Sequence, residues 1–265
     1  MEAALEAIII VWDESPLDEN QDLPRVPVPL KVRREASDSL NNRFQPDADI
    51  RTRAVLMLDD DVMIRCEVVS QAFAAWRQQQ HKLVGFFPRR AVVDSQKPSY
   101  NLVDDYTRGA YNLILTKGTF MDSRAFQMYA SPPYAKARHL VDALQNCEDI
   151  LMNFVWAKEM RAELGAAANS TVLFASPQCY AETSKLCRAP GAEWSISMGS
   201  RSKTHLRNRA LCGQLFAEML GSNPLPHVPF EKSTVRPREI WPEKADGWVA
   251  QGYNSSLAQL FRSQC

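Results

Sequence analysis

The stretch Ala54-Val-Leu-Met-Leu-Asp-Asp-Asp61 decides the fold class, because an apolar run of five residues passes directly into three carboxylates. A continuous apolar run is typical of a strand that is buried on both faces of a parallel sheet. Open α/β sheets bind their ligands at the carboxyl ends of such strands. The sequence therefore predicts a ligand site that contains Asp59, Asp60 and Asp61.

The segments around this stretch predict strands that alternate with helices. Strands are expected at residues 5–12, 28–33, 54–58, 83–87, 111–116 and 172–175. Helices are expected from the spacing of apolar residues at 66–79, 123–130, 148–164 and 203–220. Residues 89–110 are polar and predict irregular structure. This order predicts an α/β fold with a mainly parallel central sheet flanked by helices.

Composition places the chain among soluble globular proteins. Its 265 residues include 31 Lys and Arg against 31 Asp and Glu, and 45% are hydrophobic. A net charge of zero argues against nucleic-acid binding through bulk charge. The sequence contains neither an apolar run as long as a membrane span nor the pattern of a signal peptide at its start. We expect one domain over residues 1–221, with an irregular tail containing Pro and aromatic residues packed on it over 222–265.

The three adjacent carboxylates repel one another, so we expect a divalent cation such as Mn²⁺ or Mg²⁺ beside them. Two enzyme classes place such carboxylates at a strand end: glycosyltransferases that use nucleotide sugars, and phosphatases of the haloacid-dehalogenase type. A phosphatase would form an aspartyl-phosphate on Asp59. Its pattern has the motif on the first strand and a small β-branched residue where this chain has Met63, so the phosphatase interpretation is weaker. The alternative in which these three carboxylates have no function is a solvated acidic turn.

Five segments occur in an order that resembles one glycosyltransferase family. They are Asn42-Arg43-Phe44, Ala54–Asp61, Val84-Gly-Phe-Phe-Pro-Arg89, Gln145-Asn-Cys-Glu-Asp-Ile-Leu-Met-Asn-Phe154 and Gly199-Ser-Arg-Ser-Lys-Thr-His-Leu-Arg-Asn-Arg-Ala-Leu-Cys212. Together they resemble the C-terminal glycosyltransferase domain of the exostosin family, glycosyltransferase family 64, over roughly residues 5–220. The resemblance implies a GT-A type fold, a UDP-sugar donor, a divalent metal that is usually Mn²⁺, and transfer with retention at the anomeric carbon.

The resemblance also implies roles for the residues that match the family's donor site. Asp61 would bind the metal, while Asp59 and Asp60 would face the ribose and the metal-bound diphosphate. Arg43 matches an arginine that binds the donor, and Arg209 matches one that stabilises the diphosphate leaving group. A guanidinium suits phosphate because its planar fork of donors is always charged. Taken singly, either arginine could instead form a surface ion pair.

Glu148 and Asp149 begin a predicted helix and match a pair of family carboxylates that is generally Asp-Asp. The resemblance places them beside the sugar and the acceptor hydroxyl. In a front-face reaction a carboxylate there orients the acceptor and supports oxocarbenium-like charge, whereas double displacement would need it as a nucleophile. Carboxylates in a first helical turn also stabilise the helix itself, which is the structural alternative.

Two further carboxylates depart from the family pattern. Asp13 and Asp38 stand where the family has Asn, and an ionised carboxylate accepts hydrogen bonds but cannot donate them. We expect both in the donor-binding region, with His205 near the diphosphate, although a single helical His is also typical of simple packing. With Glu148, these departures leave a non-catalytic sugar-binding relative as an alternative to an enzyme.

The six cysteines are scattered singly, and their spacing by itself favours free buried thiols. The resemblance implies instead a disulfide between Cys147 and Cys212, and a second pair, Cys179 with Cys187, is expected across a short loop. A disulfide indicates an oxidising compartment, here the lumen of the endoplasmic reticulum or Golgi. We therefore expect transfer of an N-acetylhexosamine from a UDP-sugar to a glycan or glycolipid, by a full-length form anchored to the membrane outside this chain.

Overall fold

The computed structural model describes residues 5–13, 23, 25–60, 62–64, 66–102, 110–165, 168, 171–174, 180–182 and 203–229. Within these residues four strands form the central sheet, in the order β11, β5, β10, β3. Their bounds are β3 (Ala54–Leu58), β5 (Leu83–Gly85), β10 (Gly118–Asp122) and β11 (Val172–Phe174). Strand β10 runs antiparallel to both β3 and β5, and β11 pairs parallel with β5.

The central sheet is therefore mixed, and the prediction of a mainly parallel sheet is wrong for the described strands. Strand β10 is fully buried, yet its sequence Gly-Thr-Phe-Met-Asp has too few apolar residues to be predicted as a strand. A strand covered on both faces has the same apolar composition whichever way it runs, so its direction depends on its neighbours. The prediction of an α/β class is confirmed by a sheet packed against helices.

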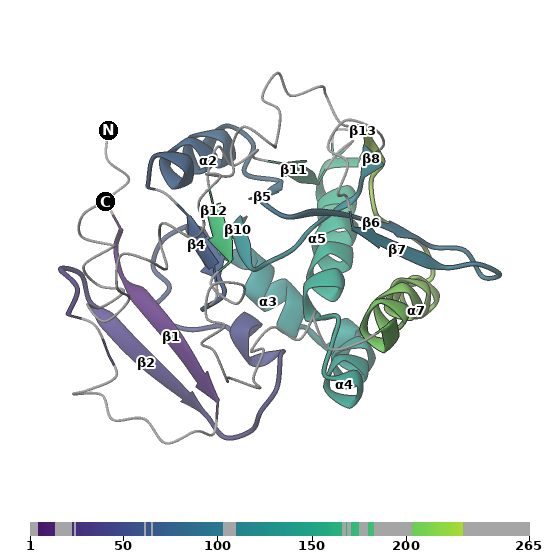
Figure 1. The fold of residues 1–265 in the computed structure, drawn as a ribbon, viewed down its shortest axis with the longest axis horizontal. Coiled ribbons are helices and arrows are strands. Elements are labelled where there is room, and N and C mark those ends of the chain that lie inside the picture. The colour runs from purple at the N-terminus through teal and green to yellow at the C-terminus, as the bar shows by residue number, and fades with distance from the viewer. Residues whose placement is uncertain are drawn as a thin grey trace, which may run out of the picture.

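Smaller sheets surround this central one. Strand β1 (Ile8–Asp13) pairs parallel with β2 (Leu30–Glu35), which confirms two predicted strands, and this pair lies to one side of the molecule (Figure 1). The short strands pair antiparallel, β4 (Val62–Ile64) with β12 (Tyr180–Glu182) and β8 (Ala110–Tyr111) with β13 (Val228–Pro229).

Part of the segment predicted to be irregular is a β-hairpin. Strand β6 (Pro88–Val92) pairs antiparallel with β7 (Ser99–Leu102) and with β9 (Leu113–Ile114). The prediction for residues 89–110 is wrong here, because these polar strands are stabilised by pairing with each other rather than by an apolar pattern. Strand β7 packs against α7 (Lys203–Leu220), on the right of Figure 1.

The helices agree closely with the predicted ones. They are α2 (Cys66–Gln78), α3 (Arg124–Ala130), α4 (Ala135–Leu144), α5 (Glu148–Leu164) and α7, with the 3-10 helices η1 (Asn42–Phe44) and η2 (Pro132–Tyr134). Helix α4 had no predicted counterpart, although Ala137, Val141 and Leu144 follow helical spacing. In the described ranges, every helix is too short or too polar to cross a membrane.

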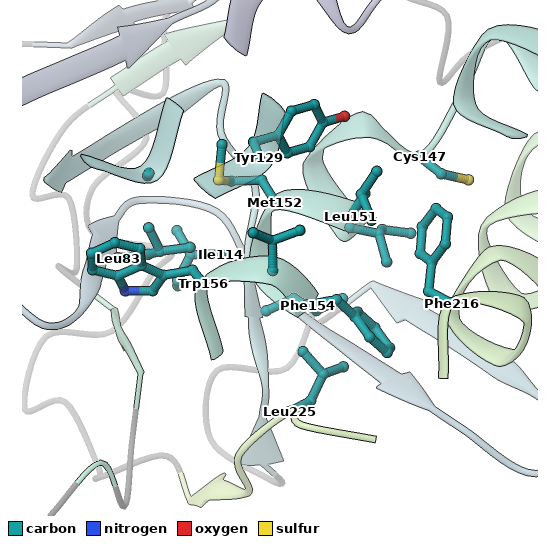
Figure 2. Close-up of a cluster of buried hydrophobic side chains, with 14 of the residues drawn as sticks. Leu83, Ile114, Tyr129, Cys147, Leu151, Met152, Phe154, Trp156, Phe216 and Leu225 are labelled. Atoms are coloured by element: carbon teal, nitrogen blue, oxygen red, sulfur yellow. The ribbon is translucent and has the colours of Figure 1, made fainter. Parts of the chain in front are cut away.

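Helix α5 runs through the main hydrophobic core (Figures 1 and 2). Every residue from Asp149 to Ala157 is buried, and the ring of Phe154 lies 5.9 Å from that of Phe216 in α7. A helix buried on nearly all sides carries polar groups only where they have specific partners. Asn153 has one, since its side chain exchanges two hydrogen bonds with the backbone of Ile114. The buried carboxylate of Asp149 belongs to the site described below.

The boundary that was predicted between residues 221 and 222 coincides with the end of α7. Gly221 follows the helix with a φ of 74°, a left-handed conformation that glycine adopts without strain. Beyond it Leu225 is buried and β13 pairs with β8, so residues 222–229 pack on the domain. Residues 230–265 lie outside the described residues, and the division into a domain and a tail stays a prediction.

Candidate active site

Four parts of the chain meet around the N-terminus of α5. Helix η1 contributes Arg43, the turn after β3 contributes Asp59, α5 begins with Glu148 and Asp149, and α7 contributes Arg209. Two arginine–carboxylate contacts join these parts, the part-buried one of Arg43 with Asp59 and the buried one of Arg209 with Asp149. The structure thus brings together residues that the sequence placed in separate motifs.

Arg43 lies between two carboxylates. Its Nη2 donates to Asp59 Oδ1 at 2.5 Å, and its Nη1 lies 3.9 Å from Glu148 Oε1. Burial lowers the pKa of Arg43, but the charges of Asp59 and Glu148 outweigh that effect and raise it. The side chain of Arg43 is 18% exposed and that of Asp59 is 30% exposed, so their ion pair is partly shielded from solvent.

Glu148 is the carboxyl group with the most perturbed ionisation in this cluster. Its side chain is 12% exposed, and burial together with the charge of Asp149 raises its pKa to about 7, against the opposing effects of Arg43 and Arg209. At neutral pH both its protonated and its ionised forms are populated. Such a group can accept or donate a proton near the N-terminus of α5.

Arg209 and Asp149 form the second buried pair. Arg209 Nη2 donates to both carboxylate oxygens of Asp149, at 2.7 and 2.6 Å, and Nη1 donates to Asn146 Oδ1 at 3.1 Å. The guanidinium lies 4.7 Å from the centroid of the Tyr100 ring. Burial lowers the pKa of Arg209, but the charges of Asp149, Tyr100 and Glu148 and the hydrogen bonds to Asp149 together raise it by more, so Arg209 is held as a cation.

Two of these contacts come from residues that the sequence did not single out. Asn146 belongs to the motif around Glu148, and its position immediately before Cys147 and Glu148 was the available signal. Tyr100 lies in β7, within the segment predicted to be irregular, and its contact with Arg209 depends on the hairpin. His205 lies beside them, with Nδ1 at 3.2 Å from Asn146 Nδ2, and burial followed by the charge of Arg209 lowers its pKa.

Asp13 and Asp38 lie close to η1 and to the end of α4, respectively. Asn42 Nδ2 donates to Asp13 Oδ1 at 2.7 Å, which holds the end of β1 against η1. Burial raises the pKa of Asp13, the hydrogen bond from Asn42 lowers it, and the charges of Asp38 and Glu35 raise it further. Asp38 itself is exposed, and its backbone oxygen accepts a hydrogen bond from Gln145 Nε2 at 3.3 Å.

The carboxylates proposed as metal ligands are only partly within the described residues. Asp59 is half-buried and Asp60 is exposed in the turn after β3, whereas Asp61 lies outside the described residues. In the part of the chain that the structure describes, no three His, Cys, Asp or Glu side chains are placed to share an ion. Asp59 and Asp60 offer the hard oxygen ligands that Mn²⁺ and Mg²⁺ prefer, so the donor type fits such a metal.

A disulfide joins Cys147, immediately before α5, to Cys212 in α7, with 6.4 Å between the Cα atoms. The disulfide implied by the resemblance is therefore confirmed, and free thiols are excluded for these two cysteines. Cys147 has a φ of 79° and Gln145 one of 45°, values that are uncommon for residues other than glycine. The disulfide links the residue immediately before Glu148 to the helix that contains Arg209. Cys179 and Cys187 lie outside the described residues.

A cavity of about 400 Å³ lies at the opposite end of α5, and none of the predicted site residues lines it. Its arginines include Arg53 and Arg124, which both bind the buried carboxylate of Asp122, and Arg124 also pairs with Glu163. Arg53, Arg124 and Glu163 in this cavity therefore all have partners of opposite charge. The candidate active site is therefore defined by the cluster around Glu148 and not by this cavity.

Comparison with known proteins identifies the family. A model described as "Glycosyl transferase family 64 domain" matches residues 2–235, which is nearly the whole chain. The chain belongs to glycosyl transferase family 64. This confirms the family that the motifs around Arg43, Asp59, Glu148 and Arg209 indicated, and it leaves the phosphatase interpretation without support.

The curated relatives of the family 64 chain include proteins named as a sugar transferase and as exostosins. It is 35% identical over 223 residues to glucosamine inositolphosphorylceramide transferase 1 of Arabidopsis thaliana, covering 83% of this chain and 27% of that protein. The rice (Oryza sativa subsp. indica) protein of the same name is 35% identical over 250 residues, covering 92% and 29%. Human exostosin-2 is 29% identical over 244 residues, covering 91% and 32%. The chain thus spans about a third or less of the length of these relatives.

Proposed function

We propose that this family 64 domain is a metal-dependent retaining glycosyltransferase that moves an N-acetylhexosamine from a UDP-sugar to a glycan or glycolipid. The observation that carries the proposal is a pair of arginines, the part-buried Arg43 and the buried Arg209, held beside the adjacent carboxylates Glu148 and Asp149. Cationic forks next to carboxylates are what a diphosphate leaving group and a developing oxocarbenium ion need. A GT-A type fold is part of the same proposal.

In the proposed reaction, Arg43 and Arg209 bind the diphosphate through the Nη atoms that now contact Asp59 and Asp149. The acceptor oxygen forms a bond to the anomeric carbon on the face from which UDP departs. The bond to the diphosphate oxygen breaks, and the acceptor proton passes to that oxygen. Glu148 and Asp149 orient the acceptor hydroxyl and stabilise positive charge at the anomeric carbon, while His205 flanks the diphosphate.

Asp61, with Asp59 and Asp60 beside it, would hold Mn²⁺ or Mg²⁺ in this proposal. The ion, when bound, neutralises charge on the departing diphosphate. Asp13, which accepts a hydrogen bond from Asn42, and Asp38 would contact the nucleoside part of the donor. The disulfide between Cys147 and Cys212 supports a lumenal compartment, the endoplasmic reticulum or Golgi, because disulfides persist in oxidising environments.

The names of the relatives refine the donor and the acceptor. The two plant relatives are named for glucosamine and for inositolphosphorylceramide, and they are more similar to this chain than human exostosin-2 is. We therefore place an amino sugar of the glucosamine type first among donors and a glycolipid first among acceptors. A glycan acceptor is the second choice.

Calorimetric titration of UDP into the protein, with and without Mn²⁺, tests the proposal. We expect binding that requires Mn²⁺, followed by hydrolysis or transfer when UDP-N-acetylglucosamine replaces UDP. Asp61→Ala should abolish the metal-dependent binding, and Arg209→Ala should mainly lower turnover. Absence of UDP binding in both conditions would refute the donor site. Binding without any hydrolysis or transfer would favour the non-catalytic relative that Asp13, Asp38 and Glu148 allow.

A further inference from the structure

The side chain of Asn41 uses its hydrogen-bonding groups in a network that joins a buried tyrosine of α3 to the exposed Asp142 of α4. Its Oδ1 accepts from the Tyr129 hydroxyl at 2.5 Å, and its Nδ2 donates to Asp142 Oδ1 at 2.7 Å and to the backbone oxygen of Arg138 at 3.0 Å. Asn41 is 4% exposed and Tyr129 is 0% exposed. A buried polar network whose members all have partners makes the surrounding structure rigid. This network joins η1 to α3 and α4.

The network determines where the backbone of η1 lies. The amides of Asn42 and Phe44 donate to the backbone oxygens of Ser39 and Asn41, each at 3.0 Å. The ring of Phe44 lies 4.8 Å from that of Tyr129. Because Asn41 immediately precedes η1, its bonds to α3 and α4 also hold the next residues, including Arg43. Residues 39–44 are thus attached to the two helices along their length.

The same part of α4 leads directly into the candidate active site. Gln145, at its C-terminal end, donates to the backbone oxygen of Asp38, and three residues later Glu148 begins α5. The buried Nε of Arg43 has no hydrogen-bond partner, so the position of its guanidinium depends on its backbone and on its contacts with Asp59 and Glu148. Burial, and then the charge of Glu148, raises the pKa of Tyr129 well above its usual value, so its hydroxyl remains a hydrogen-bond donor to Asn41.

We propose that Asn41 is a positioning residue for the donor site, acting with Tyr129 and Asp142. The network fixes η1 on α3 and α4 and so sets the distance from Arg43 to Glu148 and to the diphosphate. Removal of one hydroxyl or amide in the network would loosen residues 39–45 and weaken donor binding without removing any group that touches the donor. This inference rests on the proposed function.

Tyr129→Phe and its matched control Tyr134→Phe test the proposal. Tyr134 is a second buried tyrosine, 1% exposed, whose hydroxyl donates to Glu159, a residue outside the candidate site. Each substitution removes one buried hydroxyl. Amide hydrogen exchange of Asn42, Phe44 and Gln45 reports on η1 without any ligand, and calorimetry with UDP and Mn²⁺ reports on the donor site. Asp142→Ala is a second network variant, since it removes the acceptor for Asn41 Nδ2 and leaves the hydrogen bond from Tyr129 in place.

For Tyr129→Phe and Asp142→Ala we expect exchange at these amides to become about tenfold faster and UDP affinity to fall about tenfold, the effect of one net hydrogen bond. Tyr134→Phe should leave both quantities within about twofold of wild type, even with an equal loss of thermal stability. Unchanged exchange in Tyr129→Phe would overturn the proposal. So would faster exchange with unchanged UDP affinity, or an equal loss of affinity in Tyr134→Phe. If the wild type binds no UDP, the proposed function fails and the positioning of a donor fails with it, whereas exchange still decides whether the network holds η1.

Discussion

Replacement of Arg209 by methionine would leave the carboxylate of Asp149 buried without its cation. Both residues are 6% exposed, and the two contacts of 2.7 and 2.6 Å account for the charge of Asp149. Breaking a buried pair by removing one partner costs about 3–5 kcal/mol of folding free energy. In a domain of this size that loss lowers the melting temperature by roughly 6–20 °C. We expect Arg209→Met to show a loss in this range in urea unfolding followed by tryptophan fluorescence.

A double variant separates stability from chemistry. Arg209→Met combined with Asp149→Asn buries no charge, so it should recover most of the lost stability, because neutral replacement of a buried pair is often tolerated. Transfer activity should remain lost, since the leaving group still lacks its arginine. Arg207→Met is the matched control. Arg207 lies on the same helix but is exposed, and its replacement should change stability by less than about 0.5 kcal/mol.

Three results would refute this reasoning. A loss of less than about 1 kcal/mol in Arg209→Met would mean that the pair with Asp149 is not desolvated as described. A double variant no more stable than the single one would show that the unpaired carboxylate is not the cause. Transfer at the wild-type rate by the double variant would remove Arg209 from the proposed reaction.

Further measurements address other parts of the molecule. Replacing Cys147 and Cys212 by serine removes a cross-link between residues 65 apart and should cost about 4 kcal/mol in urea unfolding; dithiothreitol should then destabilise the wild type but not this variant. Glu148 has a pKa of about 7 in the folded state, against an ordinary value of 4.5, so the folded protein binds this proton more tightly than the unfolded chain does. The metal-free protein should therefore lose roughly 1–3 kcal/mol of stability as pH rises from about 4.5 to 7. Glu148→Gln should lack that slope, and an unchanged slope would contradict the assignment. Gly85→Ala would place a Cβ 2.4 Å from Thr119 Oγ1, and the overpacking should cost at least about 1–3 kcal/mol by the same urea assay; a neutral effect would contradict the close approach of β5 and β10.

Local patterns were sufficient for the elements that carry the site. The apolar run of β3 ends directly before Asp59, and the spacing of apolar residues predicted α5 and α7 to within a residue or two. These elements are long, or strongly apolar, and their own residues supply the signal. The motifs around Arg43, Glu148 and Arg209 likewise indicated the family before the fold was known, because each motif is short and continuous in the sequence.

Local patterns failed where a segment is stabilised by its partners. Strand β10 is buried despite its Thr and Asp, and the hairpin of β6 and β7 is polar, so in both cases hydrogen bonding to neighbouring strands outweighs composition. The direction of β10 made the sheet mixed. The contact of Tyr100 with Arg209 followed from the hairpin and had no signal in the sequence.

The sequence by itself determined which residues of this protein are candidates for the functional site. They are the carboxylates after β3, the pair that begins α5, the arginines Arg43 and Arg209, and the cysteines. Only the tertiary structure decided that Arg43 lies between Asp59 and Glu148, that Arg209 binds Asp149, and that Asn41 joins η1 to α3 and α4. The physical reason is that burial and helical periodicity are properties of neighbouring residues in the chain. Desolvated ion pairs and buried hydrogen bonds depend instead on groups that folding brings together from distant segments.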